Sequence, residues 1–424
     1  METLLHYIWK YRLYNPETLT TLTGNSVFII DPGTHNTNAG PDFFNAKIRI
    51  DNETWAGNIE IHSYASDWVK HGHHTDKAYD SVILHVVEHP NANIQAENGR
   101  FIPQLVLSIP EKIKGNYEFL LSRNTLIPCL TQISEIPKLY LTDWINALSI
   151  ERLERKTDNL YKLLRDYKDN WGEVFYITLS RNFGFGINNE AFERLARSLP
   201  LKHILKHKDS SLQVEALFFG QAGLLNDDDD GKIQDDYYCS LKKEYDFLHK
   251  KFNLKPLEGH IFKSLRIRPN NFPHIKIAQL ASLIRTQDTL FSQMLELDNI
   301  PALRNLFISE LNQYWETHYL FGKISSKKKK IIGLSAQNGI LINTAIPVLF
   351  AYGKSKNQPQ IQEKAIQFLE QIKPENNYIV NEFVKFGITP CHAGDSQALL
   401  QLQKEYCEKK KCIFCRIGHK LLSK

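Results

Sequence analysis

The order of hydrophobic and polar residues divides the chain into a strand-rich first part and a longer helical part. Apolar residues recur at helical spacing between residues 2 and 14, which predicts a first helix. Short runs rich in β-branched and aromatic residues follow, separated by Gly, Pro, Asn and Asp, and these runs predict strands. The predicted strands cover residues 26–31, 43–50, 55–62, 81–88 and 104–108.

After Pro128-Cys129 the apolar residues take up the spacing of helices. Residues 148–167 place Leu and Ile between Arg, Glu and Lys in the pattern of an amphipathic helix. We therefore predict an α+β protein, with a mixed-sheet α/β domain over residues 1–112 and a mostly α-helical region over residues 113–424. Further helical patterns cover residues 190–198, 211–225, 240–252, 275–286, 300–319, 360–372 and 396–409.

The composition, with 42% hydrophobic and 23% charged residues, is that of a globular protein. The longest apolar stretch, residues 339–353, contains Asn343, Thr344 and Pro347 and falls short of the roughly 18 apolar residues of a membrane span. The first residues lack the basic start of a signal peptide, and six cysteines are too few for a disulfide scaffold. We expect a cytoplasmic protein without a membrane segment.

Basic residues are concentrated in two places. The segment from Lys404 to the C-terminus carries a formal charge as large as the net charge of the whole chain, +5, and a lysine run covers residues 327–330. Such runs are usually solvated loop and tail surface. The alternative is a surface that contacts phosphate, as a nucleic-acid partner would require.

Chemically informative residues surround the second and third predicted strands. Asp42 precedes one strand, and in the next strand Glu60 and His62 share a face, because alternate side chains of a strand point the same way. We expect this face to be the exposed side of the hairpin. Two carboxylates suit Mg²⁺ or Mn²⁺. A third group, His62, would orient or deprotonate a water molecule for attack on a phosphodiester.

The expected pairing of the two strands conflicts with this site. A two-residue turn at Asn52-Glu53 puts the apolar residues of both strands on one face, as a core requires. The same register turns Asp42 to the face opposite Glu60. A bulge or bend after Gly40-Pro41 would bring the carboxylates together. The alternative is a polar surface patch on a half-buried hairpin.

A helix, a Pro-Asp pair on a strand and Glu-x-His on the next strand resemble the PD-(D/E)XK, or restriction-endonuclease-like, nuclease superfamily over about residues 1–110. The resemblance implies that Asp42 and Glu60 bind the catalytic metal, that His62 replaces the family's lysine, and that Glu2 is an optional further carboxylate. It implies a divalent-metal-dependent nuclease acting on nucleic acid. Since neutral histidine offsets less phosphate charge than lysine, the alternative is a non-catalytic nucleic-acid-binding or scaffold protein with this fold.

A histidine-rich loop follows the hairpin. His71, His73 and Asp76 are the candidate substrate-binding residues, and we expect their loop to overhang the sheet end. Exposed loop histidines without a ligand are the alternative, and a different metal-dependent hydrolase that uses this loop is a third hypothesis. His85, in an apolar strand, is expected to be a hydrogen-bonded core residue.

The C-terminal cysteine cluster, at residues 391–419, predicts a second metal site. Cys407, Cys412 and Cys415 are spaced as ligands of zinc, or of an iron–sulfur cluster, and with zinc their sulfurs should lie about 3.5–4 Å apart. His419, one helical turn after Cys415, is the first choice for the fourth ligand, and Cys391 is the alternative.

The whole chain also resembles an uncharacterised bacterial protein family, a domain of unknown function. The resemblance rests on residues 38–43, 66–68 and 82–87 and on the terminal cysteines. It brings no activity with it, so the substrate, the choice between DNA and RNA, and the oligomeric state stay open.

Overall fold

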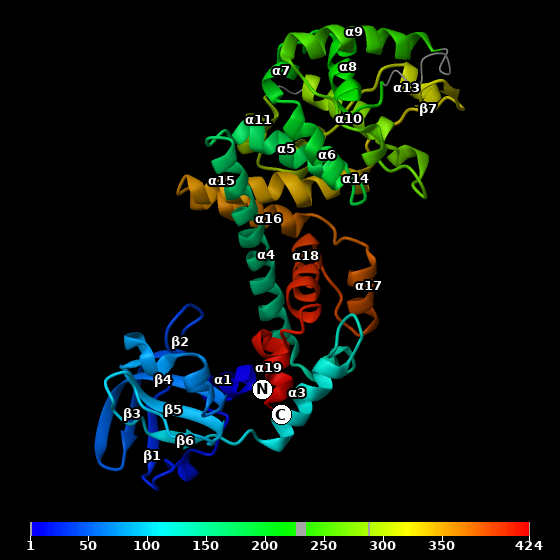
Figure 1. The fold of residues 1–424 in the computed structure, drawn as a ribbon. Coiled ribbons are helices and arrows are strands. Elements are labelled where there is room, and N and C mark those ends of the chain that lie inside the picture. The colour runs from blue at the N-terminus through cyan, green and yellow to red at the C-terminus, as the bar shows by residue number, and fades with distance from the viewer. Residues whose placement is uncertain (1, 226–234, 287–288, 424) are drawn as a thin grey trace. The chain divides into compact units, whose positions relative to one another are not determined.

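The computed structural model describes residues 2–225, 235–286 and 289–423. The chain forms two compact units, one made of Met1–Trp144 with Leu402–Lys424 and the other of Ile145–Gln401. The first unit holds the sheet and the second is helical, which confirms the α+β class (Figure 1). The predicted division between residues 112 and 113 differs from this one in two ways. The first unit runs on to Trp144, and the chain returns to it at Leu402.

The sheet of the first unit is mixed. Its strands lie in the order β1-β3-β4-β5-β6, and the short strand β2 also pairs with β3. The pairs β1–β3 and β3–β4 are antiparallel, whereas β4–β5 and β5–β6 are parallel. The strands are β1 (Val27–Asp31), β2 (Thr34–His35), β3 (Phe43–Ile50), β4 (Glu53–Tyr64), β5 (Val82–His89) and β6 (Gln104–Val106).

Helix α1 (Glu2–Lys10) packs against strand β4 of this sheet. Its apolar side chains at helical spacing are completely buried and share one core with the inward-facing residues of the strands. Helix α3 (Glu111–Ser122), the 3₁₀ turn η10 (Cys412–Phe414) and helix α19 (Arg416–Leu422) enclose the same core. The C-terminal segment is therefore a structural part of the first unit, which the sequence patterns did not predict.

The pairing of β3 with β4 differs from the expected register. Ile50 pairs with Glu53, so the turn is Asp51-Asn52 and not Asn52-Glu53. Asp51 has φ 50°, a left-handed conformation that Asp tolerates better than most residues. The register shifts again between Phe43 and Ala46, where Asn45 has φ 57°. This bulge lets Phe43 pair with Ile59 and brings the preceding residue level with Glu60.

The second unit is a bundle of helices around its own apolar core. The predicted helix over residues 300–319 is wrong in its second half, which forms a short helix and a hairpin. The helices are α4 (Lys138–Asp166), which begins in the first unit, α5 (Trp171–Phe183), α6 (Asn189–Ser198), α7 (Leu201–Leu205), α8 (Ser211–Gln221), α9 (Asp236–Phe252), α10 (Pro273–Thr286), α11 (Leu290–Glu296), α12 (Ile300–Asn305), α13 (Tyr314–Thr317), α14 (Leu334–Ile340), α15 (Ile346–Ser355), α16 (Pro359–Gln371), α17 (Tyr378–Lys385) and α18 (Ala393–Gln401), and the hairpin is β7 (His318–Leu320) with β8 (Lys323–Ile324).

One helical stretch, Leu334–Ser355, is long and apolar enough to cross a membrane by length and composition. It includes α14 and α15, joined by a π-helical turn at Leu341–Ala345. Two thirds of its most apolar window, 67%, is buried inside the structure. Its apolar side chains therefore belong to the core of the second unit, as those of a central helix do.

Candidate functional site

The bulge in β3 brings Asp42 and Glu60 together. The backbone N–H of Asp42 donates to Oε2 of Glu60 over 3.0 Å, and the N–H of Ile61 donates to Oδ2 of Asp42 over 2.9 Å. These reciprocal hydrogen bonds hold the two carboxylates at the same level of neighbouring strands. Glu60 is only 4% exposed, so the expectation of a solvent-facing position for this residue is wrong.

Three imidazoles face the two carboxylates. His6, from α1, places Nε2 3.3 Å from Oδ2 of Asp42. His62, two residues after Glu60 on β4, and His73, from the 3₁₀ turn η2 (His73–Thr75), place Nε2 3.5 Å and 3.2 Å from Oε1 of Glu60. Glu60 therefore directs one oxygen to two imidazoles and the other to the backbone of Asp42.

The histidines also approach one another. The nitrogen donor atoms of His62, His71 and His73 all lie within 4.8 Å of one another. Over the described residues, this is the group of three metal-binding side chains that lies close enough to hold one ion. His62 contacts His71 across 3.1 Å and His85 across 2.9 Å, each through a ring nitrogen. Ligands around one tetrahedral ion at about 2.0–2.1 Å from the metal lie roughly 3.3 Å apart, so this spacing suits a single metal ion.

The histidine loop is held in place by aromatic packing. The ring of His73 stacks on Tyr79 at a centroid distance of 3.8 Å, and the completely buried Trp68 meets the rings of His73 and His85 edge-on at 5.4 Å. Gly72, with φ 77°, makes the turn from α2 (Asp67–Lys70) into η2. His73 is consequently buried and fixed, whereas His71 is exposed at the rim.

Burial controls the protonation of the cluster. It raises the pKa of Glu60, an effect that the His73 hydrogen bond opposes and the nearby charge of Asp42 reinforces. Burial, then His73 and His71, lower the pKa of His62 to about 4, and burial lowers the pKa of His85 well below its usual value. Near pH 7 both imidazoles are therefore neutral, the form in which histidine binds metals.

Comparison with known proteins places the chain in a family. The model of a family described as a protein of unknown function (DUF2851) matches residues 2–378. The chain belongs to this family. No curated protein and no solved structure matches it. In this family member the match includes the whole carboxylate–histidine cluster and ends before the C-terminal cysteines.

The other residues predicted for this site lie around it. Asp76 is exposed, and its Oδ1 accepts the N–H of Ala78 at the start of the turn η3 (Lys77–Tyr79), a capping role. Glu2 lies in the first turn of α1, and its charge adds slightly to a raised pKa of His6. For His6 itself, burial lowers the pKa and the hydrogen bond and charge of Asp42 outweigh that effect. No local pattern identifies His6 as a site residue, because only the docking of α1 brings it to Asp42.

The predicted ligands of the second metal site belong to two units. Cys412 is the first residue of η10 and Cys415 follows this turn, both buried, and Cys407 ends the π-helical turn η9 (Leu402–Cys407). His419 shares a hydrogen bond of 2.7 Å between its Nδ1 and the hydroxyl of Tyr7, and Cys391 belongs to the second unit. The cysteines are not in the group of donors within 4.8 Å of one another over the described residues, and zinc stays a prediction.

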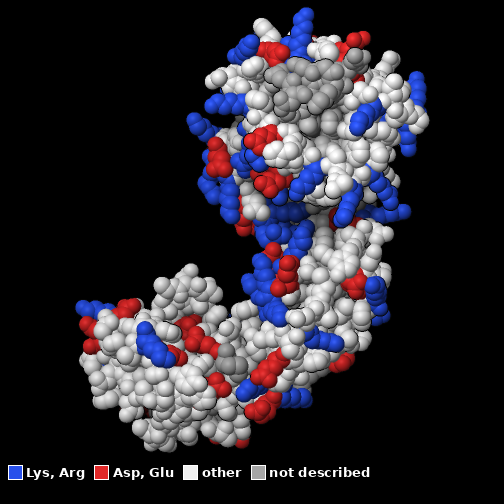
Figure 2. Space-filling model, turned by 45° about the vertical axis from the view of Figure 1, so that its right-hand side comes forward, with Lys and Arg blue, Asp and Glu red and all other residues white. Residues whose placement is uncertain are grey.

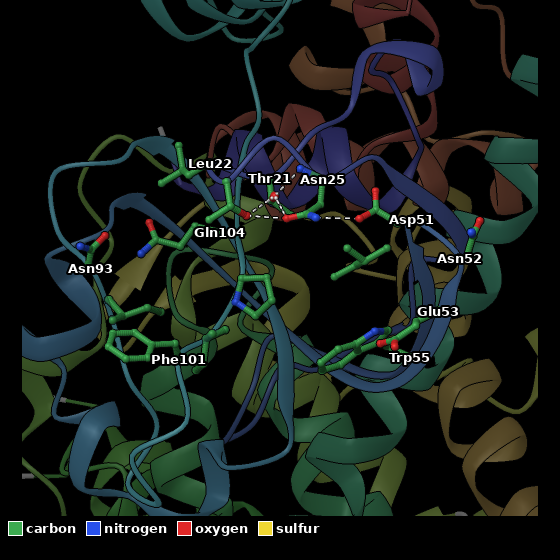
Figure 3. A pocket seen from close by; sticks show the side chains of 15 residues that line it. Thr21, Leu22, Asn25, Asp51, Asn52, Glu53, Trp55, Asn93, Phe101 and Gln104 are labelled. Atoms are coloured by element: carbon green, nitrogen blue, oxygen red, sulfur yellow. Dashed lines mark hydrogen bonds between the residues drawn. The ribbon is translucent and has the colours of Figure 1, made fainter.

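A large cavity lies elsewhere in the first unit. It has a volume of about 720 Å³ and lies at the β3–β4 turn, whereas Asp42 and Glu60 lie toward the other end of this hairpin. Figure 3 shows hydrogen bonds that join Thr21, Asn25 and Asp51 in its lining, with Asn25 donating to Asp51 over 2.6 Å. No carboxylate–imidazole pair lines it among the described residues. We assign the candidate chemistry to the cluster because the cluster, not the cavity, gathers groups that bind metals.

Proposed function

We propose that this protein is a divalent-metal-dependent phosphodiesterase that acts on nucleic acid, with its metal centre at the carboxylate–histidine cluster. The observation that carries the proposal is the position of Glu60, with one oxygen facing His62 and His73 and the other held at Asp42. Buried neutral imidazoles beside carboxylates are a typical donor set for a catalytic transition metal.

The donor chemistry favours Mn²⁺ over Mg²⁺. Magnesium prefers oxygen ligands and keeps several waters, whereas imidazole suits manganese, zinc and iron better. Asp42, Glu60, His62, His71 and His73 are the residues that would hold the ion, and a bound ion would supply a hydroxide for attack on phosphorus. His6 positions Asp42, and His85 positions His62 through the ring nitrogen that faces away from Glu60.

The histidine loop and the carboxylates support one hypothesis instead of two. The sequence suggested either a nuclease centre on the hairpin or a different hydrolase that uses the loop. Because His73 lies 3.2 Å from Glu60, both sets of residues belong to the same centre. The loop would therefore bind the metal, and the exposed His71 at its rim would be the residue nearest to an incoming substrate.

Nucleic acid is the proposed substrate for two reasons. The hairpin motif resembles that of the PD-(D/E)XK nucleases, and Lys and Arg side chains are spread over the face of the second unit in Figure 2. Part of the lysine run at 327–330 is structural, since Lys330 is buried and donates to the carbonyls of Trp315 and Glu316. Phosphate contacts are therefore proposed for the exposed basic residues only.

Cleavage of labelled single- and double-stranded DNA and RNA, with Mn²⁺, Mg²⁺ or chelator, tests the proposal. We expect cleavage with Mn²⁺ that Glu60→Gln abolishes, whereas Glu53→Gln, the same change at the exposed start of β4, preserves it. Equal cleavage by wild type and Glu60→Gln would identify a contaminating nuclease and overturn the proposal. Metal and nucleic-acid binding without cleavage would favour the non-catalytic scaffold.

A further inference from the structure

Two buried cysteines lie one tight turn apart near the C-terminus. The backbone N–H of Cys415 bonds to the carbonyl of Cys412 over 3.2 Å, closing the 3₁₀ turn η10. The two residues are 6% and 8% exposed. A Cys-x-x-Cys turn of this kind directs both thiols to the same side, as in many metal sites. Gly418 packs so closely on this turn that a Cβ there would lie 2.0 Å from the carbonyl oxygen of Cys412.

A third cysteine joins this turn from the preceding segment. After Cys407 the chain folds back, with the N–H of Lys410 bonded to the carbonyl of Cys407 over 3.1 Å and a left-handed conformation at Lys410, φ 51°. The side chain of Lys410 donates to the carbonyl of Leu121 over 2.6 Å, which ties this loop to the last turn of α3. Cys407 is therefore brought back toward η10.

The fourth cysteine comes from the segment that follows α3. Cys129, which precedes the 3₁₀ turn η4 (Leu130–Glu135), packs against the apolar cluster that includes Cys412. Helix α3, which precedes this segment, and the turn η9, which ends at Cys407, both contact η10. The segments that carry Cys129 and Cys407 therefore meet at the turn that holds Cys412 and Cys415.

The two other predicted ligands are engaged elsewhere or belong to the other unit. His419 holds the hydroxyl of Tyr7 with its Nδ1 and packs its ring against Tyr11 at a centroid distance of 4.4 Å. Cys391 lies in the second unit, where its N–H donates to Asp395 over 2.7 Å. Neither residue is therefore the natural partner of the three C-terminal cysteines.

We propose that Cys129, Cys407, Cys412 and Cys415 form a four-thiolate metal site that fastens the C-terminal segment to the chain after α3. Four thiolates select a soft metal centre, either zinc or an iron–sulfur cluster. Analysis of the bound metal distinguishes the two.

Metal analysis of the full chain, purified without oxygen, tests the site. We expect either one zinc per chain or iron with acid-labile sulfide, and a loss of at least about tenfold in this metal in Cys129→Ala. Cys391→Ala and His419→Gln should keep the wild-type content. Loss of the metal in Cys129→Ala alone would support the four-cysteine site, and the element found identifies the metal centre. Full metal content in Cys129→Ala, or a metal-free wild type, would overturn the proposal.

Because Cys129→Ala also removes a side chain that packs against the core, the ligand set is read in the wild type as well. X-ray absorption at the metal edge should show sulfur alone in the protein's contribution to the ligand shell, with no imidazole scattering. A shell with one imidazole would assign the fourth position to a histidine and contradict the role of Cys129. This measurement is independent of the carboxylate–histidine centre if its metal is first removed with a mild chelator.

Discussion

Replacing Glu60 with glutamine separates metal binding from folding. The amide keeps an oxygen that accepts the N–H of Asp42, so the metal-free variant should unfold with a free energy within about 1 kcal/mol of wild type. Glu60→Ala leaves that N–H without its partner in a largely buried position and should cost about 1–3 kcal/mol. An uncharged amide is a far weaker metal ligand than a carboxylate, and alanine has no ligand atom in its side chain. Both variants should therefore lose the ion.

Linkage gives the size of the expected effect. Mn²⁺ at 100 times its dissociation constant stabilises the folded state by about 2.7 kcal/mol if it binds that state alone. Wild type and Glu53→Gln should show this gain, and Glu60→Gln should show none. Urea titrations read by hydrogen exchange in peptides from β4 report on the first unit only, which matters because two units need not unfold together. An equal Mn²⁺-dependent gain in Glu60→Gln would refute the placement of the metal at Glu60.

Three further changes test other parts of the structure. Asn45→Val should destabilise the first unit by about 1–2 kcal/mol and weaken Mn²⁺ binding measured by calorimetry, because a β-branched residue resists the left-handed conformation of the bulge. Asn45→Gly should preserve both the stability and the Mn²⁺ affinity. Gly418→Ala should cost at least about 1–3 kcal/mol in urea denaturation because of its contact with Cys412, whereas Gly115→Ala in α3, where a Cβ meets nothing within 4 Å, should not destabilise. Burial raises the pKa of Glu215 to about 7 from an ordinary value of 4.5. The free energy of unfolding of the second unit should therefore fall by about 3 kcal/mol as pH rises from 4.5 through 7. Denaturation measured at several pH values should show this fall in the wild type and not in Glu215→Gln.

The sign of the Glu215 effect follows from proton binding. Between the two pKa values the folded protein keeps the proton and the unfolded chain has lost it, so stability falls as pH rises. The hydrogen bonds from Trp315 Nε1 over 2.8 Å and from the hydroxyl of Tyr237 over 2.9 Å favour the ionised form and limit the shift. Stability that stays constant over this window, in wild type and variant alike, would contradict the raised pKa.

Local patterns predicted the strands well and the hairpin pairing poorly. Alternation identified β3 and β4, because burial on one face leaves a period of two in the sequence. The register depends on which two residues make the turn. The turn uses Asp51, in a left-handed conformation, and Asn52, whereas the pattern predicted Asn52 and Glu53. The bulge at Asn45 is held by a hydrogen bond from its N–H to Oδ1 of Asn58, a contact that exists only once the strands have paired. No local signal predicts it.

The candidate ligands divide in the same way. Asp42, Glu60 and His62 were found from one hairpin, and His71 and His73 from the following loop, because residues close in sequence leave a visible motif. His6 and Cys129 were missed, since each reaches its cluster through tertiary packing of a separate segment. Sequence spacing also favoured His419 over Cys129, although a helical turn from Cys415 directs that imidazole to Tyr7 instead.

Helix α1 connects the two candidate metal sites within the first unit. His6 contacts Asp42, and the next residue, Tyr7, shares a hydrogen bond with His419 of helix α19. This helix begins directly after Cys415 of the cysteine turn. The apolar side of α1 is completely buried in the core that Cys412 and Leu422 also complete. Because interiors are closely packed, displacement of the C-terminal segment would expose this core and loosen the helix that positions Asp42. The four-cysteine site would therefore support the carboxylate–histidine centre by keeping α1 in place, without contributing a ligand to it.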